Sequence, residues 1–315
     1  MSYKGITGTF LDEITYDIAS SNWGEKEWRR EFDTFVEAGL DTVIVIRAGL
    51  GERLACPSKT ISRHVRTLPV YQDLVGLFLQ LASERGIRLL LGLYDSGYFW
   101  YRHDWRREVE INAEFIRELL DRYGDSPAFG GWYLPHETPD TSLRILEIHT
   151  ALAEAIREVS QLPILISPYF LARAEYAQPG AGRRGAPLSV EEHARQWEEI
   201  FSHLSGLVTY CAFQDGTADL LVLEDYVRAT RELADRFGIE LWSNAETFDR
   251  DVPIKFPPID WRKLAYKLDV VQPYVEKIIT FEFSHFLSPN SIWPSARLLY
   301  RRYRDLLRDR SAAHG

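Results

Sequence analysis

The sequence predicts an α/β fold of the (β/α)8 barrel type, and three observations point to it. Eight apolar, strand-like runs alternate strictly with eight amphipathic, helical runs. The links from helix to strand are short, whereas most links from strand to helix are long. The length of 315 residues suits one barrel with insertions in its loops. We therefore expect a single barrel domain over residues 1–315, with a doubly wound open sheet as the alternative.

The predicted strands are short runs of aliphatic, β-branched and aromatic residues. In chain order they span residues 6–10, 42–47, 88–93, 130–134, 164–167, 207–211, 240–244 and 277–281. Because each strand is followed by a helix rather than by a tight turn, all eight strands are expected to be parallel. Eight strand–helix units are the number that closes a sheet into this type of barrel.

The predicted helices lie between these strands and have apolar residues at i, i+3 and i+4, the period of an amphipathic helix. They span residues 25–38, 71–85, 104–123, 142–159, 190–204, 223–237, 261–271 and 295–308. Most are followed by a glycine, such as Gly39 or Gly238, because glycine adopts the left-handed conformation that ends a helix. The longest strand-to-helix links span residues 48–70, 169–189 and 245–260. In a barrel such loops gather at the C-terminal face, where the active site lies.

Composition and charge exclude several classes of protein. A net charge of −9 disfavours a nucleic-acid binder, which needs a basic surface for the phosphates. No run approaches the ~18 apolar residues that span a membrane, so no membrane partner is expected. The two cysteines, Cys56 and Cys211, are too few for a disulfide framework or a Cys-rich zinc site. The chain begins without the basic and apolar segments of a signal peptide, and we expect it to be cytoplasmic.

Polar and aromatic side chains follow the C-terminal ends of the predicted strands, where we expect the substrate to bind. Aromatic residues make up 13% of the chain, and aromatic faces in a cleft suit sugar rings. The residues expected to contact the substrate are Arg47, Tyr94, Asp95, His136, Tyr169, Tyr210, Gln214, Trp242, Asn244, Glu282, His285 and Trp293. Trp242 and Asn244 share one face of their strand with Glu246, because side chains alternate along a strand.

Two carboxylates, Glu137 and Glu246, stand out among these strand ends. They follow the fourth and seventh predicted strands, which lie across the mouth of a barrel from each other. Breaking a glycosidic bond needs a proton on the leaving oxygen and a negative group facing the oxocarbenium-like carbon, and two carboxyl groups supply both. One must stay protonated near neutral pH while the other stays ionised. The pair indicates hydrolysis of a saccharide or glycoside without a cofactor or metal. The two carboxyl groups should lie ~5–6 Å apart if the reaction retains the anomeric configuration, and near ~9 Å if it inverts it.

Three segments of the chain resemble a known family. They are ITGTF at residues 6–10, EAGLDTVIV at 37–45 and GGWYLPHE at 130–137. They look like those of a family of glycoside-hydrolase-like TIM barrels long carried as a domain of unknown function, and the resemblance runs from residue 5 to about residue 293. Its most specific part is the Tyr-x-Pro-x-Glu motif that ends at Glu137. More distantly, the layout is similar to clan A of the retaining glycoside hydrolases.

The resemblance to clan A implies a role for each glutamate. In that clan the acid/base Glu follows strand four and the nucleophile Glu follows strand seven, and these roles fall here on Glu137 and Glu246. The clan usually has an Asn before the acid/base, where it binds the sugar 2-hydroxyl, but this sequence has His136 there. The sugar, its linkage and its anomer are therefore left open.

Two other functions fit the same strand ends. A metal-dependent sugar isomerase or epimerase would hold a divalent ion through carboxylate oxygens. The residues that would supply them are Asp95, Glu137, Asp215, Glu246 and Glu282. A non-catalytic barrel would bind carbohydrate without turning it over, but the presence of both Glu137 and Glu246 favours an enzyme. In every case we expect a carbohydrate partner, while the oligomeric state is left open.

Overall fold

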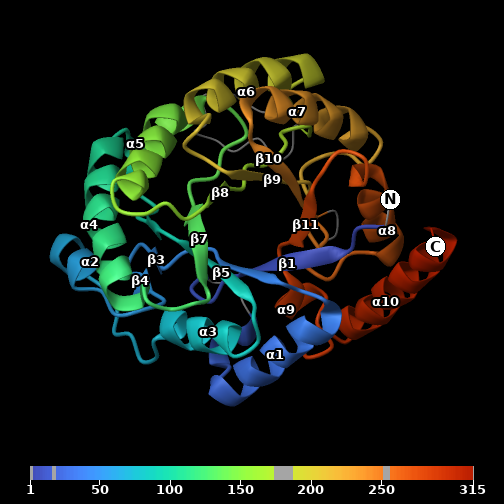
Figure 1. Cartoon of the computed structure of the whole chain (residues 1–315), viewed down its shortest axis with the longest axis horizontal. Helices are drawn as coiled ribbons and strands as arrows, with labels where there is room; N and C mark the ends of the chain where they lie inside the picture. The colour runs from blue at the N-terminus through green and yellow to red at the C-terminus, as the bar shows by residue number, and fades with distance from the viewer. Residues whose placement is uncertain (1–2, 16–18, 174–186, 251–255, 315) are drawn as a thin grey trace.

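Eight parallel strands close into a barrel, and helices surround it on the outside (Figure 1). The computed structural model describes residues 3–15, 19–173, 187–250 and 256–314. Around the barrel the strands are ordered β1, β2, β5, β7, β8, β9, β10 and β11, and β11 closes onto β1. Every neighbouring pair in this ring is parallel. The predicted (β/α)8 barrel is confirmed.

The elements of the described chain have the following bounds. The barrel strands are β1 (Ile6–Leu11), β2 (Thr42–Val45), β5 (Arg88–Gly92), β7 (Phe129–Leu134), β8 (Ile164–Ile166), β9 (Tyr210–Gln214), β10 (Glu240–Asn244) and β11 (Lys277–Thr280). The α-helices are α1 (Glu25–Ala38), α2 (Lys59–His64), α3 (Leu74–Ser83), α4 (Trp105–Tyr123), α5 (Ile145–Arg157), α6 (Val190–Leu204), α7 (Leu223–Phe237), α8 (Trp261–Val271), α9 (Phe283–Phe286) and α10 (Pro294–His314). Short 3₁₀ helices are η1 (Ala19–Asn22), η2 (Trp100–Arg102) and η3 (Ser142–Arg144), and a separate small sheet consists of β3 (Gly49–Leu50), β4 (Arg53–Leu54) and β6 (Tyr94–Asp95). None of the helices described here is long and apolar enough to cross a membrane.

Several elements have the bounds that the sequence predicts, namely α1, α6, α7, α8 and β10. Local signals mark their ends. Ser189 and Glu192 form a capping box that satisfies free backbone N–H groups at the start of α6. Gly39 follows α1 with φ 82°, a left-handed conformation that glycine adopts without strain. Because these signals need no tertiary contact, the sequence alone defines where such helices begin and end.

Strand β9 lies three residues later than predicted, at Tyr210–Gln214 instead of 207–211. The apolar residues Leu207 and Val208 suggested the earlier start. In the structure the backbone N–H groups of both residues donate to the carbonyl oxygen of Leu204 and close the end of α6. The shift moves Tyr210 to the N-terminal end of its strand and makes Gln214 the last residue of that strand.

The small sheet stands at the C-terminal end of the barrel, beside β2 and β5. The long link after β2 contains β3, β4 and α2, and β3 pairs in parallel with β6, which follows β5. The side chain of Tyr94 in β6 is buried and donates a hydrogen bond to the carbonyl oxygen of Gly51 at 2.9 Å. The predicted loop over residues 48–70 is therefore partly regular structure, and Tyr94 helps to fix it.

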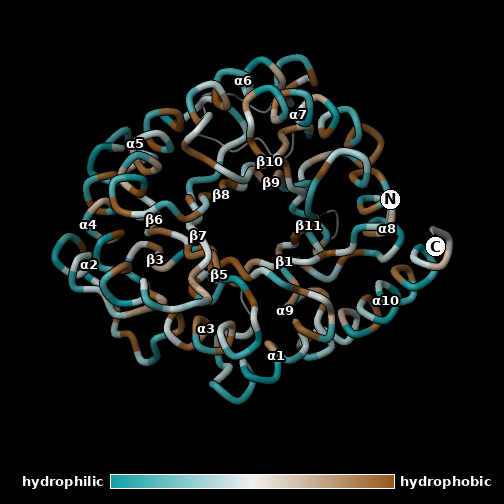
Figure 2. Tube along the Cα trace, in the orientation of Figure 1, coloured by the Kyte–Doolittle hydropathy of each residue, from teal (hydrophilic) through white to brown (hydrophobic). Residues whose placement is uncertain are grey.

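Buried hydrophobic residues form two clusters, one on each side of the barrel wall. The larger cluster lies between the strands and the helices, and in Figure 2 the helices alternate between hydrophilic and hydrophobic residues, as amphipathic helices do. The smaller cluster fills the barrel and consists of Phe10, Ile44, Ile46, Leu90, Tyr133, Leu165, Tyr210, Ala212, Trp242 and Ile279. Cys56 and Cys211 are buried free thiols. Because side chains fill the barrel, a ligand must bind at its mouth.

A buried carboxyl group in α1 predicts that stability depends on pH. Ser288 and Asn290 donate hydrogen bonds to Oε2 of Glu31, and burial raises the pKa of Glu31 to about 7. The folded protein thus binds this proton more tightly than the unfolded chain, so the free energy of unfolding falls as pH rises from 4.5 to about 7. Glutamine does not ionise, so Glu31→Gln removes this fall in the free energy of unfolding.

We expect Glu31→Gln to raise Tm by a few degrees at pH 8, with a much smaller difference at pH 5. Thermal unfolding followed by circular dichroism measures both values. A lower Tm than wild type at pH 8 would contradict the prediction.

Candidate active site

A cavity of about 160 Å³ opens at the C-terminal mouth of the barrel. Its polar lining consists of Asp12, Thr15, Arg47, Glu137, Gln214, Asn244, Glu246 and Arg250. Its apolar lining consists of Phe10, Ile46, Phe248, Phe256 and Phe281. These residues lie near the C-terminal ends of β1, β2, β7, β9, β10 and β11. This is the face on which barrel enzymes bind their substrates.

Glu137 and Glu246, the two carboxylates that the sequence singles out, line this same cavity. Burial raises the pKa of Glu137, and the negative charge of Glu246 raises it further. The charge of Arg47 and hydrogen bonds from Gln214 and Tyr133 oppose this effect without cancelling it. The Tyr133 hydroxyl donates to Oε1 of Glu137 at 2.9 Å. Glu137 is therefore a carboxyl group that keeps its proton to higher pH than usual, facing a second carboxylate.

The carboxylate of Glu246 is held from two sides. Arg250 Nη2 donates to Oε1 of Glu246 at 3.1 Å, and the same guanidinium lies 4.8 Å from the ring centroid of Phe248. On another side Glu246 lies against Gly216, where an added Cβ would clash with Oε2. Only glycine leaves room for the carboxylate in this position. These contacts restrict the Glu246 side chain, which is 3% exposed, to one place at the cavity wall.

Three of the predicted binding residues, Arg47, Gln214 and Asn244, also line the cavity. Arg47 Nε donates to Asp95 Oδ2 at 3.3 Å, so predicted Asp95 pairs with a lining residue. Gln214 Nε2 donates a hydrogen bond to the backbone carbonyl oxygen of Ser167 at 2.7 Å. Asn244 Nδ2 donates one to the hydroxyl of the same serine at 3.2 Å. Within the described part of the chain, Oδ1 of Asn244 is buried without a hydrogen-bond partner. Asn244 thus combines a fixed amide nitrogen with an acceptor oxygen that no described residue uses, beside the cavity.

The aromatic wall of the cavity consists of residues that sequence reasoning missed. The ring centroid of Phe281 lies 6.2 Å from that of Phe10 and 6.0 Å from that of Phe248. Such rings pack well against the C–H face of a sugar. Phe10 is the next-to-last residue of β1 and Phe281 directly follows β11, so strand alternation could have found both. Phe248 and Phe256 follow β10 in a long loop, whose path no sequence pattern defines.

Tyr210 and Trp242 lie inside the barrel rather than in the lining of the cavity. Their rings stack with centroids 4.3 Å apart. Lys277 and Arg88, the first residues of β11 and β5, lie 5.6 Å from the Trp242 ring and 5.9 Å from the Tyr210 ring. Both aromatic rings therefore occupy the N-terminal half of the barrel. Tyr210 is expected from the sequence to contact substrate because its strand is predicted three residues too early. For Trp242, side-chain alternation correctly predicts that the ring points into the barrel, but it does not predict how far from the mouth the ring lies.

Tyr94 and Trp293 are also absent from the residues that line the cavity. Tyr94 belongs to β6 of the small sheet, and its buried side chain donates a hydrogen bond to the carbonyl oxygen of Gly51. Trp293 precedes α10, and its backbone N–H donates to the hydroxyl of Ser291 at 3.1 Å. Tyr94 therefore stabilises the small sheet, and Trp293 lies directly before α10. Neither residue lines the cavity.

Tyr169 lies close to the cavity without lining it. It forms a β-bridge with Gln214. Burial raises the pKa of its hydroxyl to about 12, and the negative charges of Asp140 and Glu137 contribute. Tyr169 is therefore a neighbour of the carboxyl group that the sequence singles out. The loop that follows it lies largely outside the described residues, over 174–186.

Glu282 and His285 form a buried pair next to Asp12. The carboxylate of Glu282 contacts Nδ1 of His285, and its Oε2 accepts a hydrogen bond from the backbone N–H of Asp12 at 3.1 Å. His285 Nε2 accepts a hydrogen bond from the backbone N–H of Ser20 at 3.1 Å. These two predicted residues therefore support Asp12, which lines the cavity, and do not line it themselves.

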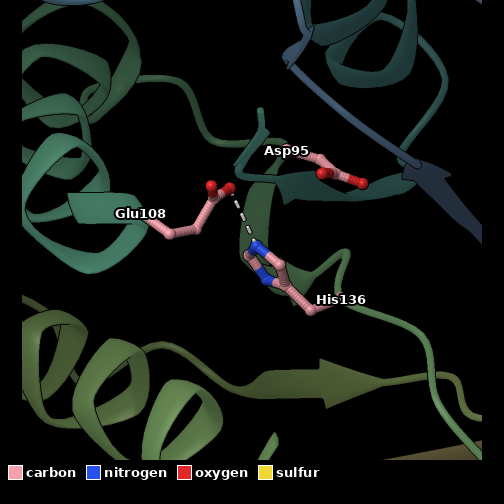
Figure 3. A group of neighbouring side chains, drawn as sticks. All are labelled: Asp95, Glu108 and His136. Carbon is pink, nitrogen blue, oxygen red and sulfur yellow. Dashed lines mark hydrogen bonds and ion pairs between the residues drawn. The ribbon is translucent and has the colours of Figure 1, made fainter. Parts of the chain in front are cut away.

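Asp95 and His136 belong to a buried group with Glu108 of α4 (Figure 3). Potential metal-ligand atoms of these three lie within 4.8 Å of one another. The carboxylates already have partners: Asp95 Oδ1 accepts from Trp100 Nε1 at 3.0 Å, and Glu108 Oε1 accepts from the backbone N–H of Ser96 at 2.9 Å. His136 Nε2 lies 3.0 Å from the same Glu108 oxygen, so His136 turns away from the cavity toward α4. The other carboxylates of the metal hypothesis lie outside this group: Glu137, Asp215, Glu246 and Glu282.

Several solved structures of glycoside hydrolases are similar to this barrel in fold. The chain is 39% identical to a "putative alpha-L-fucosidase" from Bacteroides thetaiotaomicron, with a TM-score of 0.89 over 96% of this chain and 93% of that one. It is also similar to an endo-1,4-beta-D-mannanase from Thermotoga petrophila, at 13% identity and a TM-score of 0.58 over 95% and 99% of the two chains. A GH99 endo-alpha-mannosidase from Bacteroides thetaiotaomicron gives 13% identity and a TM-score of 0.56 over 98% of each chain. The last two similarities show the fold alone.

A family model covers nearly the whole barrel. The model described as "Domain of unknown function (DUF4434)" matches residues 6–293, whereas no curated protein matches the chain. The match confirms the resemblance that the three sequence segments indicate, and the structural neighbours confirm the more distant likeness to clan A hydrolases. The chain therefore belongs to the family described as Domain of unknown function (DUF4434), and its fold is a glycoside-hydrolase-like TIM barrel.

Proposed function

We propose that the protein is a retaining glycoside hydrolase, with Glu137 as acid/base and Glu246 as nucleophile. One observation carries the proposal: both carboxyl groups line one cavity at the barrel mouth, and burial raises the pKa of Glu137. Two carboxyl groups in different environments are what an acid and a nucleophile in one site need. Retention further requires the two groups to lie ~5–5.5 Å apart.

The reaction takes place with the glycosidic bond between the two glutamates. Protonated Glu137 gives its proton to the leaving oxygen as that bond breaks, while the carboxylate of Glu246 bonds to the anomeric carbon. Water then attacks the same carbon, Glu137 takes a proton from the water, and the bond to Glu246 breaks. Both glutamates are thereby restored. Asn244, whose side chain lines the cavity, is the residue we assign to hydrogen bonding with a sugar hydroxyl.

The cavity suits a single sugar ring. Its volume of about 160 Å³ is below the ~300 Å³ at which pockets for drug-sized ligands begin. Its lining combines aromatic rings with polar side chains, which match the apolar faces and the hydroxyl groups of a sugar. The relative at 39% identity is named a "putative alpha-L-fucosidase", and a fucosyl unit has a methyl group for the aromatic wall. We therefore place α-L-fucosides first among the substrates to test.

A panel of chromogenic glycosides and natural oligosaccharides tests the proposal on wild type and on Glu137→Gln. We expect turnover of at least one glycoside by the wild type and a large loss in the variant with substrates whose leaving group needs a proton. Activity that disappears with a chelator and returns with a divalent ion would favour a metal-dependent enzyme instead. Saturable sugar binding by calorimetry without any turnover would favour the non-catalytic alternative.

The raised pKa of Glu137 predicts where activity falls at alkaline pH. The first step needs the protonated acid, so activity is full below this pKa and is lost as pH rises through it. Because burial raises the pKa above its ordinary value of 4.5, the decline should begin above the usual carboxyl range. The measurement is kcat/KM against pH for a poor leaving group. With an activated leaving group, Glu137→Gln should lack this decline, and an unchanged decline would assign it to another group.

A further inference from the structure

A buried lysine lies behind the proposed nucleophile. Lys267 of α8 is 4% exposed, and lysines are almost never buried unless they are paired. Its Nζ donates to Oδ1 of Asp215 at 2.7 Å. Asp215 directly follows β9 and is 1% exposed. Neither residue takes part in the proposed steps of the reaction, so this ion pair needs another explanation.

Both members of the ion pair bind the backbone of Glu246. Oδ1 of Asp215 accepts a hydrogen bond from the Glu246 N–H at 3.0 Å. Nζ of Lys267 donates a second hydrogen bond to the Glu246 carbonyl oxygen at 3.1 Å. One residue thus has both of its polar backbone groups held by the two halves of one ion pair. Hydrogen bonds in which one partner is ionised are roughly twice as strong as neutral ones.

We propose that the Asp215–Lys267 pair positions the carboxylate of Glu246 for attack on the anomeric carbon, so that both are positioning residues. This inference rests on the proposed role of Glu246 as nucleophile. The pair fixes the backbone, while Arg250 and Gly216 bound the side chain. Together these contacts leave the carboxylate little freedom relative to a sugar in the cavity. Such control matters because a misplacement of about 1 Å can lower a rate on the order of 100-fold.

The contacts of the pair argue against a purely stabilising role. In the described part of the chain, the side-chain hydrogen bonds of Asp215 and Lys267 go to each other and to Glu246 alone. A buried ion pair adds little net stability, because desolvation offsets much of the attraction between the charges. The pair lies at the barrel mouth, and apart from the bond between its two members its side-chain hydrogen bonds go to Glu246. We therefore infer that its role is to hold Glu246 in place.

The first test is Lys267→Met, with kinetics on the best glycoside of the panel. We expect kcat to fall on the order of 100-fold and KM to change little, because alignment of the nucleophile affects the chemical step. Lys267→Arg keeps the charge and should recover part of the lost activity. A raised KM with unchanged kcat would overturn the proposal, since it would place Lys267 in substrate binding.

The second test is chemical rescue of Lys267→Ala. Lys267 lines a neighbouring cavity of about 290 Å³, formed between the segments that follow β9 and β10, which gives small amines access to this position. Propylamine and butylamine should restore part of kcat, whereas propanol and butanol should not, because only the ammonium group carries the missing charge. A folded Lys267→Ala protein that no amine rescues would contradict a role for that charge.

The matched control is Lys277→Met. Lys277 has a 12% exposed side chain and pairs with Asp41 at the N-terminal end of the barrel, so its loss removes a mostly buried cation far from Glu246. We expect it to keep wild-type kcat.

A neutral double variant covers the case in which Lys267→Met fails to fold because Asp215 is left charged and buried. Asp215→Asn/Lys267→Met has no unpaired charge and should show the same loss of kcat. If Glu246→Gln is inactive while this double variant keeps wild-type kcat, the positioning role is wrong and the proposed function stands. If Glu246→Gln is fully active, the proposed function itself is wrong.

Discussion

Glu246→Gln should leave almost no turnover of any glycoside. Glutamine has the shape of glutamate, and the backbone contacts to Asp215 and Lys267 stay available, but its amide does not attack the anomeric carbon. No glycosyl-enzyme then forms. By comparison with other enzymes that lose a covalent nucleophile, we expect kcat/KM to fall on the order of 10⁴-fold or more. Steady-state kinetics measure the loss, and intact-protein mass spectrometry should detect a glycosyl adduct on wild type alone.

A control on the same strand separates this effect from damage to the barrel. Glu240 is the first residue of β10, is exposed and accepts a hydrogen bond from Trp242 Nε1 at 2.7 Å. Glu240→Gln therefore changes the same functional group at the opposite end of the strand, and we expect nearly wild-type kinetics. Wild-type activity in Glu246→Gln would remove that residue from the mechanism.

The features that sequence could predict depend on short stretches of chain. Gly238 ends α7, and the run from Glu240 to Asn244 that follows has strand bounds identical to the predicted ones. Alternation past Asn244 then places Glu246 at the barrel mouth. The position of Glu137 follows similarly from the sequence. Pro135 comes directly after β7, so Glu137 lies just beyond the C-terminal end of that strand. The shared cavity of the two glutamates thus follows from local pattern together with barrel geometry.

The features that sequence could not predict depend on contacts between distant segments. Lys267 in α8 reads as an ordinary polar position of an amphipathic helix, and its partner Asp215 lies 52 residues earlier. Glu108 in α4 has the same local appearance and is fully buried beside His136. Arg250 belongs to a loop without periodicity. Whether a helix charge faces solvent or a neighbour is decided by packing, which a single sequence does not encode locally.

Glu137→Gln should behave differently from Glu246→Gln, because it removes a proton donor and base but leaves the nucleophile. With a nitrophenyl glycoside the leaving group needs no proton, so the first step should proceed and release nitrophenol. The glycosyl-enzyme should then accumulate, since no carboxylate activates water. We expect a burst of nitrophenol followed by slow turnover, and a glycosyl adduct visible by mass spectrometry.

Azide should rescue Glu137→Gln and identify which glutamate has which role. Azide needs no general base, and the loss of the negative charge at residue 137 lets a small anion approach the anomeric carbon from that side. Its attack on the glycosyl-enzyme should raise the steady-state rate and give a glycosyl azide with the anomeric configuration of the substrate. The measurement is the rate with and without azide for each variant, together with the anomer of the product. Any glycosyl azide from Glu246→Gln should be inverted and should form slowly, because azide would attack from the side of the nucleophile, where the glutamine amide still occupies the space. Retained product from Glu246→Gln and inverted product from Glu137→Gln would instead mean that the two roles are exchanged.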